Sequence, residues 1–185
     1  MSTQVAKRAD PAETPGAAQD KAQYLTFALE HETFAIGILA IKEIIEYGHL
    51  TEVPMMPEFI RGVINLRGSV VPVVDLMARF GKGKTIPARR TCIVIVEAKA
   101  GEDEVQEFGV LVDAVNEVLE IPREEVEPAP AFGTRIRPDF IHGMGKVNGR
   151  FVIILDVDQV LSLEDMANLM ALASGERENL AVATA

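Results

Sequence analysis

The chain has 185 residues, of which 48% are hydrophobic, a formal net charge of −10 and a pI near 4.8. This length suits one ordinary domain or two small ones, and the hydrophobic fraction supports a real core. The negative charge disfavours nucleic acid and anionic lipid as partners, which leaves proteins and small molecules.

Residues 1–22 contain charged residues, alanine, proline and glycine, but no apolar stretch of the kind found in signal peptides. We expect a disordered tail there. No apolar run approaches the ~18 residues of a membrane span. The single cysteine, Cys92, lies in an apolar run and is interpreted as a buried thiol in a reducing cytosol. The expected location is the cytoplasm.

Alternating apolar residues over 24–29 and 33–36 predict a β-hairpin. The segment 38–46 is ambiguous, because its isoleucine spacing suits a helix face while its β-branched residues suit a helical turn that runs into a strand. We place that strand from Glu43 onward. Two prolines within residues 53–57 predict a loop.

A long internal repeat organises the chain. Residues 57–76 return as residues 138–157 without a gap, with seven of 20 positions identical. Upstream, residues 34–46 match residues 108–120, with apolar residues answering apolar ones. Two units of about 70 residues are each near the lower limit for folding alone, so we expect them to pack together.

Each copy of the repeat predicts a second hairpin. In the first copy, strands 62–66 and 69–74 are joined by Arg67-Gly68, and a type I′ turn there requires positive φ at both central residues. The second copy has Asn148-Gly149 at the same place, a sequence that such turns prefer. The second unit also predicts strands at 91–97 and 107–112.

Two aspartates occupy equivalent positions after a strand. Asp75 and Asp156 could form a catalytic pair of carboxylates, or each could cap the stretch that follows it. Because each unit keeps its own copy at the same local place, we favour capping, and we expect Asp75→Asn to cost stability modestly.

Domain boundaries follow from the repeat. We expect a disordered tail (1–22), a first barrel unit (23–85), a second barrel unit (86–160), a C-terminal helix (161–174) and a second disordered tail (175–185). Residues 81–84, Gly-Lys-Gly-Lys, are too short for a phosphate-binding loop and are interpreted as a flexible linker between the units.

Catalytic and metal-binding signals are missing from the sequence. His31, His49 and His142 have no second ligand at helical spacing, so we predict no metal site, no cofactor and no enzymatic activity. The acidic residues within 124–127 are interpreted as a solvated loop. Core packing is the preferred role of Ile36, Ile38 and Ile41, with an interface as the alternative.

The repeat is most informative where its copies disagree. Arg67 tolerates a positive φ poorly, whereas its counterpart Asn148 tolerates it well. A residue that breaks a local rule in one copy is a candidate for function, although a solvated turn or another turn type remains an equal alternative. Glu43, with Glu117 as its counterpart, could pair with an arginine on a neighbouring strand. Such an exposed pair contributes only about 0–1 kcal/mol to stability.

Residues 59–76, preceded by the Phe-Ala-Ile and Ile-Lys-Glu elements of residues 34–43, resemble the CheW family of chemotaxis coupling proteins. The resemblance implies an all-β chain of two tandem SH3-like five-stranded barrels, related by duplication, on a shared hydrophobic interface. It implies a non-catalytic adaptor that links chemoreceptor cytoplasmic tips to the regulatory domain of the histidine kinase CheA. It also implies a cytoplasmic protein that is recruited to membrane-associated receptor arrays without inserting into the membrane.

Carried over by motif, the receptor-binding residues are Ile41, Glu43, Gly62 and Arg67. The family's second barrel is expected to bind the kinase through residues that the sequence does not identify. The chain's size leads us to expect a stand-alone adaptor rather than CheA or a receiver-bearing CheV type. Two alternatives stay open, an adaptor of a non-flagellar chemosensory pathway and a small hydrolase that uses Asp75 and Asp156.

Overall fold

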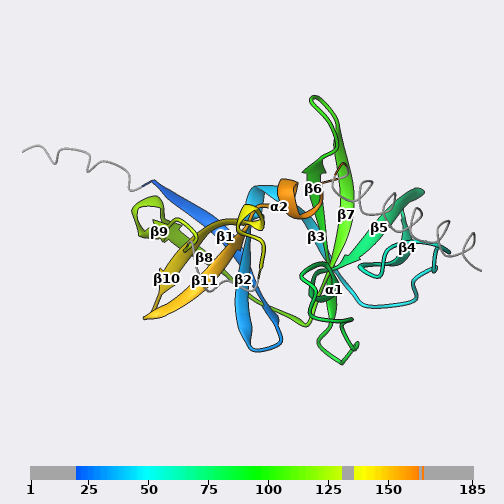
Figure 1. Ribbon diagram of the computed structural model, residues 1–185, viewed down its shortest axis with the longest axis horizontal. Helices are drawn as coiled ribbons and strands as arrows, with labels where there is room; N and C mark the ends of the chain where they lie inside the picture. The colour runs from blue at the N-terminus through cyan, green and yellow to red at the C-terminus, as the bar shows by residue number, and fades with distance from the viewer. Residues whose placement is uncertain (1–19, 131–135, 163, 165–185) are drawn as a thin grey trace, which may run out of the picture.

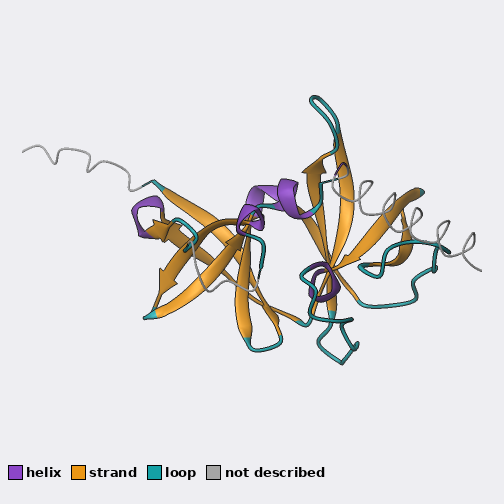
Figure 2. Cartoon of the chain, in the orientation of Figure 1, coloured by secondary structure: helices purple, strands orange, loops and turns teal. Residues whose placement is uncertain are grey.

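The computed structural model describes residues 20–130, 136–162 and 164. It is an all-β protein with two lobes, each built on one sheet (Figures 1 and 2). The elements, in chain order, are β1 (Lys21–Leu29), β2 (Glu32–Gly37), η1 (Ile38–Ala40), β3 (Ile41–Glu46), β4 (Ile60–Leu66), β5 (Ser69–Asp75), α1 (Leu76–Arg79), β6 (Cys92–Lys99), β7 (Val105–Val112), β8 (Ala114–Pro122), η2 (Arg123–Glu125), β9 (Val126–Glu127), η3 (Pro138–Phe140), β10 (Ile141–Val147), β11 (Arg150–Leu155) and α2 (Val157–Val160).

The strands form two sheets, and the strand order within each sheet is not the one that the repeat suggests. The five-stranded sheet, which we call the first barrel, has the order β3-β6-β7-β5-β4. The six-stranded sheet, the second barrel, has the order β8-β1-β2-β11-β10-β9, with β9 only two residues long. The fold class of two SH3-like β-barrels is confirmed.

The two repeats exchange their first hairpins. The β1–β2 hairpin, from the first repeat, pairs with β8 and β11 of the second, and the β6–β7 hairpin pairs with β3 and β5 of the first. The predicted division into units 23–85 and 86–160 is therefore wrong as a description of the barrels. Because the two copies offer similar strand edges, local patterns do not reveal which hairpin completes which sheet.

Two predicted boundaries change for the same reason. The expected tail 1–22 is too long, since β1 begins at Lys21, which pairs with Pro122 in β8. Residues 81–84 are not a linker between barrels, because they lie between α1 and β6, on a connection that begins and ends in the first barrel. The chain passes between barrels at η1 and again between β7 and β8.

Local predictions agree closely with the structure. The segment 38–46 is a helical turn that runs into a strand, although β3 starts at Ile41, two residues before the expected Glu43. Both repeat hairpins have left-handed turn residues, with φ of 52° at Arg67 and 50° at Asn148, each followed by a glycine of positive φ. The turn that the sequence disfavours at Arg67 is present all the same.

Most of the buried apolar surface lies between the barrels. Each barrel encloses a small cluster of its own, around Ile154 in the second and around Ile95 in the first. The largest cluster draws side chains from both sheets, including Phe34 from β2 and Phe108 from β7. Because apolar burial contributes roughly 25 cal/mol per Å², this shared core makes each barrel dependent on the other.

An arginine lies among aromatic rings at this junction. Arg79, 8% exposed, places its guanidinium carbon 5.0 Å from the ring centroid of Phe59 and 4.7 Å from that of Phe140. These phenylalanines are repeat equivalents, and Arg79 donates from Nε to the carbonyl of Val160, its own repeat equivalent, at 3.0 Å. Cation–π contacts of this kind stabilise by about 2 kcal/mol when desolvated.

Some predictions fall at or beyond the edge of the described chain. The helix expected at 161–174 and the tail at 175–185 lie almost wholly outside the described residues. Cys92 is half-buried rather than buried, and its thiol donates to the carbonyl of Arg90 at 3.3 Å. Across the described ranges, every helix is too short or too polar to span a bilayer.

Candidate functional site

The residues assigned to receptor binding lie where the two edges of the first barrel meet. β3 and β4 are the edge strands of that sheet. Arg67, in the β4–β5 turn, donates from Nη2 to Oε2 of Glu43 in β3 at 2.9 Å. The arginine side chain is 77% exposed and the glutamate 26%. The predicted pairing of Glu43 with an arginine is confirmed, although the partner, Arg67, lies in a turn rather than on a neighbouring strand.

Gly62 is buried beneath this edge, where it allows two backbone segments to pack closely. It is buried, has φ of 150°, and a Cβ there would lie 2.5 Å from the carbonyl oxygen of Thr51. Thr51 and Val63 exchange backbone hydrogen bonds of 3.0 and 2.8 Å, which join the segment after β3 to β4. Glycine is needed at position 62 so that these two segments can approach.

Ile41 likewise lies beneath the surface that carries Glu43 and Arg67. Its side chain is partly buried and packs against the shared core, as do those of Ile38 and the fully buried Ile36. The core role preferred for these isoleucines is confirmed. Of the four candidates, the structure therefore brings Glu43 and Arg67 into contact at the surface, while Ile41 and Gly62 lie under it.

The second barrel differs at the equivalent place. Glu117 and Asn148 stand where the first barrel has Glu43 and Arg67, and no hydrogen bond joins their side chains within the described chain. A cleft of about 760 Å³ lies there, lined by both residues and by Phe151. Asn148 has a shorter side chain than Arg67, so the cleft stays open here, whereas in the first barrel Arg67 reaches across to Glu43.

Sequence reasoning missed a set of exposed apolar side chains that are also repeat equivalents. Ile44 and Val70 of the first barrel, 44% and 69% exposed, correspond to Val118 and Phe151 of the second, 49% and 54% exposed. The alignment of the two copies already places an apolar residue at each of these positions in both repeats. Their recurrence in both copies makes these positions candidates for contact surfaces.

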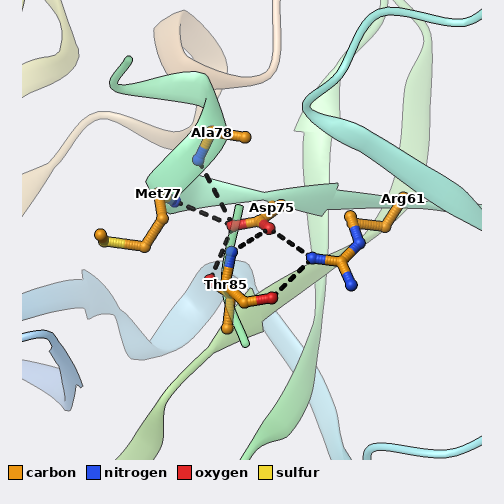
Figure 3. Close-up of polar contacts among 5 residues, drawn as sticks. All are labelled: Arg61, Asp75, Met77, Ala78 and Thr85. Atoms are coloured by element: carbon orange, nitrogen blue, oxygen red, sulfur yellow. Dashed lines mark hydrogen bonds and ion pairs between the residues drawn. The ribbon is translucent and has the colours of Figure 1, made fainter. Parts of the chain in front are cut away.

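Asp75 forms the most connected polar cluster of the first barrel (Figure 3). Its carboxylate is fully buried and accepts hydrogen bonds from Arg61 Nη1 at 2.9 Å and from the backbone N–H and hydroxyl of Thr85, both at 2.8 Å. It also accepts from the N–H groups of Met77 and Ala78 at the start of α1. The predicted capping role is confirmed, and the ion pair with Arg61 adds to it.

Among the described residues, Asp156 caps α2 with one hydrogen bond, which it accepts from the N–H of Gln159 at 3.2 Å. His142 stands at the position equivalent to Arg61, so Asp156 lacks the arginine partner that Asp75 has at that position. A general acid or base must reach its substrate, which the fully buried Asp75 does not do. The hydrolase alternative is therefore rejected, and no group of three candidate metal ligands occurs among the described residues.

Comparisons with known proteins address the same stretch. The family model described as a CheW-like domain matches residues 23–165. The chain is 34% identical over 145 residues to the chemotaxis protein CheW of Klebsiella aerogenes, covering 78% of this chain and 84% of that protein. It is 30% identical to the protein FrzA of Myxococcus xanthus over 119 residues, 63% of this chain and 71% of FrzA.

A solved structure agrees with the fold. The crystal structure of the scaffolding protein TtCheW from Thermoanaerobacter tengcongensis is similar with a TM-score of 0.69 and 35% sequence identity. The match covers 75% of this chain and 91% of that one. The similarity therefore extends over both barrels rather than over a single barrel.

Proposed function

Because this chain belongs to the CheW family of non-catalytic chemotaxis adaptors, we propose that it couples the cytoplasmic tips of chemoreceptors to the regulatory domain of the histidine kinase CheA. We place it in the cytoplasm, recruited to receptor arrays at the membrane. The observation that carries the proposal is the asymmetry of two otherwise equivalent barrels, since an adaptor needs two different surfaces.

The receptor surface is assigned to the first barrel. The exposed ion pair of Arg67 and Glu43 is worth only about 0–1 kcal/mol to stability, yet Arg67 keeps a left-handed backbone that Asn would adopt at lower cost. A residue kept against its local preference is best explained by a partner. Ile41 and Gly62 then act by holding β3 and β4 in the shape that the receptor meets.

The kinase surface is assigned to the second barrel, around Val118 and Phe151. Both are about half exposed, and Phe151 lines the cleft that also contains Glu117. Aromatic side chains are enriched in the buried centres of protein interfaces, where one such anchor contributes 2 kcal/mol or more. The first barrel offers the smaller Val70 at the equivalent position, so the two surfaces differ in shape as well as in charge.

The test measures each binding separately with purified partners. Arg67→Ala and Glu43→Ala are expected to weaken binding to a soluble receptor fragment by about tenfold or more, with kinase binding and the melting temperature nearly unchanged. Arg150→Ala, an exposed arginine beside the equivalent turn of the second barrel, is the matched control. Receptor binding at the wild-type level in both variants would remove this pair from the surface.

The reciprocal variants address the kinase. Phe151→Ser and Val118→Ser should weaken binding to the CheA regulatory domain while receptor binding persists, and Val70→Ser should leave kinase binding intact. If Val70→Ser and Phe151→Ser affect both partners equally, the division of labour between barrels is wrong. A pull-down from native extract that recovers neither a kinase nor receptors would contradict the adaptor function itself.

A further inference from the structure

The connection between α1 and β6 carries an exposed basic turn in an otherwise acidic protein. Residues 85–91, which we call the basic loop, contain two arginines and no acidic residue, in a chain of net charge −10. Arg89 and Arg90 are exposed and make no ion pair within the described chain. Ile86, in the same loop, is 88% exposed.

Buried threonines hold both ends of this loop. At one end, Thr85 is 5% exposed, donates twice to Asp75 and accepts from Arg61 at 2.8 Å through its carbonyl (Figure 3). At the other, Thr91 is 4% exposed, and its N–H donates to the carbonyl of Ala88 while its hydroxyl accepts from the N–H of Ala88. The segment between them is thus fixed at its base on both sides.

Among the described residues, the second repeat shows less of this anchoring, since the carboxylate of Asp156 accepts one hydrogen bond there, from Gln159, and His142 stands in place of Arg61. In the first repeat, the ion pair between Asp75 and Arg61 fixes the start of a surface loop through Thr85. A loop held in one conformation loses less conformational entropy when it binds a partner. Lys84, just before the loop, lines a cleft of about 190 Å³ with Glu52 and Glu58, and the positive charge within the loop itself comes from its two arginines.

An acidic turn, opposite in charge to the basic loop, lies at the far end of β6. The β6–β7 turn presents Glu102, Asp103 and Glu104, all exposed and without ion pairs among the described residues, next to Val105, which is 62% exposed. A backbone hydrogen bond of 2.8 Å from Ala100 to the carbonyl of Glu104 closes this acidic tip. Each end thus combines several charges of one sign with one exposed aliphatic side chain.

The two ends do not meet within one molecule. The basic loop precedes β6 and the acidic tip follows it, so the eight-residue strand, roughly 26 Å long, separates them. In Figure 1 they project from opposite ends of the lobe formed by the first barrel. A second copy shifted along β6 brings its acidic tip onto the basic loop of the first.

We propose that the basic loop is a docking site for the acidic β6–β7 tip of a second copy of this chain. The contact is heterologous, since it joins different surfaces, and therefore links successive copies into a ring or an open row rather than closing a symmetric dimer. Two loops bury less than the roughly 1,200 Å² of a standard interface, so the contact is weak and becomes effective where adaptors are held close together.

The test is a charge exchange followed by mixing. Sedimentation velocity at roughly 0.1 M salt should show concentration-dependent association of the wild type that is lost near 1 M, where the Debye length falls to about 3 Å. Arg89→Glu/Arg90→Glu and Glu102→Lys/Asp103→Lys should each associate about tenfold more weakly. A mixture of the two variants should associate again, because each then presents a loop that complements the other's tip.

Matched controls separate local charge from net charge. Lys146→Glu/Arg150→Glu and Glu124→Lys/Glu125→Lys make the same changes in net charge on the second barrel and should leave association unchanged. A monomeric wild type under these conditions, or a mixture that fails to associate, overturns the proposal. If the loop variant instead loses binding only to the purified kinase or receptor, the loop serves that partner and the self-association is wrong, while the adaptor function stands.

Discussion

The two barrels share hairpin turns and capping aspartates, yet they differ in ion pairs that join one element to another. The first barrel has Arg67 bonded to Glu43 and Arg61 bonded to Asp75. The second has Asn148 and His142 at those positions. The two repeats thus share a backbone framework, and Arg61 and Arg67 give the first barrel ion pairs that the residues at the equivalent positions of the second barrel do not form.

The largest expected effect tests the difference between the capping aspartates. Asp75→Asn removes a buried carboxylate and leaves Arg61 without its charge partner, so we expect a loss of about 3–5 kcal/mol in the free energy of unfolding. This loss is larger than the modest cost expected from capping alone, because capping did not include that ion pair. Asp156→Asn should cost about 1 kcal/mol or less. Urea denaturation of both variants measures the difference, and equal losses would contradict it.

Gly62 and Gly143 give the next comparison. Gly62→Ala places a Cβ against the backbone oxygen of Thr51 and forces alanine to φ of 150°, so we expect a loss of about 2–4 kcal/mol. In Gly143→Ala the Cβ would lie 2.5 Å from Cγ1 of Val126 and 3.0 Å from the backbone oxygen of Glu127, but no positive φ adds strain, so the loss should be smaller, about 1–3 kcal/mol. Thermal melting of the pair provides the measurement, and a costlier Gly143→Ala would reverse our account of this edge.

The turn residues should show a conflict between stability and binding. Arg67→Asn relieves a left-handed arginine but loses an exposed ion pair, so the free energy of unfolding should stay the same or rise by up to about 1 kcal/mol. Receptor binding should fall nonetheless. Asn148→Arg should lose about 1 kcal/mol by the same reasoning. A destabilised Arg67→Asn variant would mean that the ion pair matters more to the fold than we infer.

The smallest effect concerns an ion pair on β3 that the second barrel lacks. A hydrogen bond and the charge of Glu97, 2.6 Å away, raise the pKa of Lys42 above its ordinary value of 10.5, while Asn116 holds the equivalent position. A raised pKa stabilises the fold below 10.5, and that contribution is lost as the pH rises through the folded-state pKa. The small stability difference between wild type and Lys42→Gln should therefore persist at neutral pH and vanish in strong alkali. A difference that grows in alkali would contradict this sign.

Much of the site was accessible from the repeat. Aligning the copies isolated Arg67 against Asn148 and suggested an arginine partner for Glu43, because turn preferences depend on the residue and its immediate neighbours. The same alignment held the exposed pairs Ile44/Val118 and Val70/Phe151, but alternation alone does not tell an outward apolar residue from an inward one. The anchoring of Thr85 by Asp75 had no sequence signal, since the loop between them has no regular period.

The sequence by itself determined the strands, the turns, the aspartate caps and the duplication, because these depend on contacts within a few residues or on likeness between the copies. Only the tertiary structure decided that the hairpins are exchanged, that the barrels share one core, and that Asp75 binds Arg61 and Thr85. These depend on which of two nearly equivalent edges each segment meets. That choice is made by the packing of the whole chain, since residue patterns within one segment do not identify the edge that the segment pairs with.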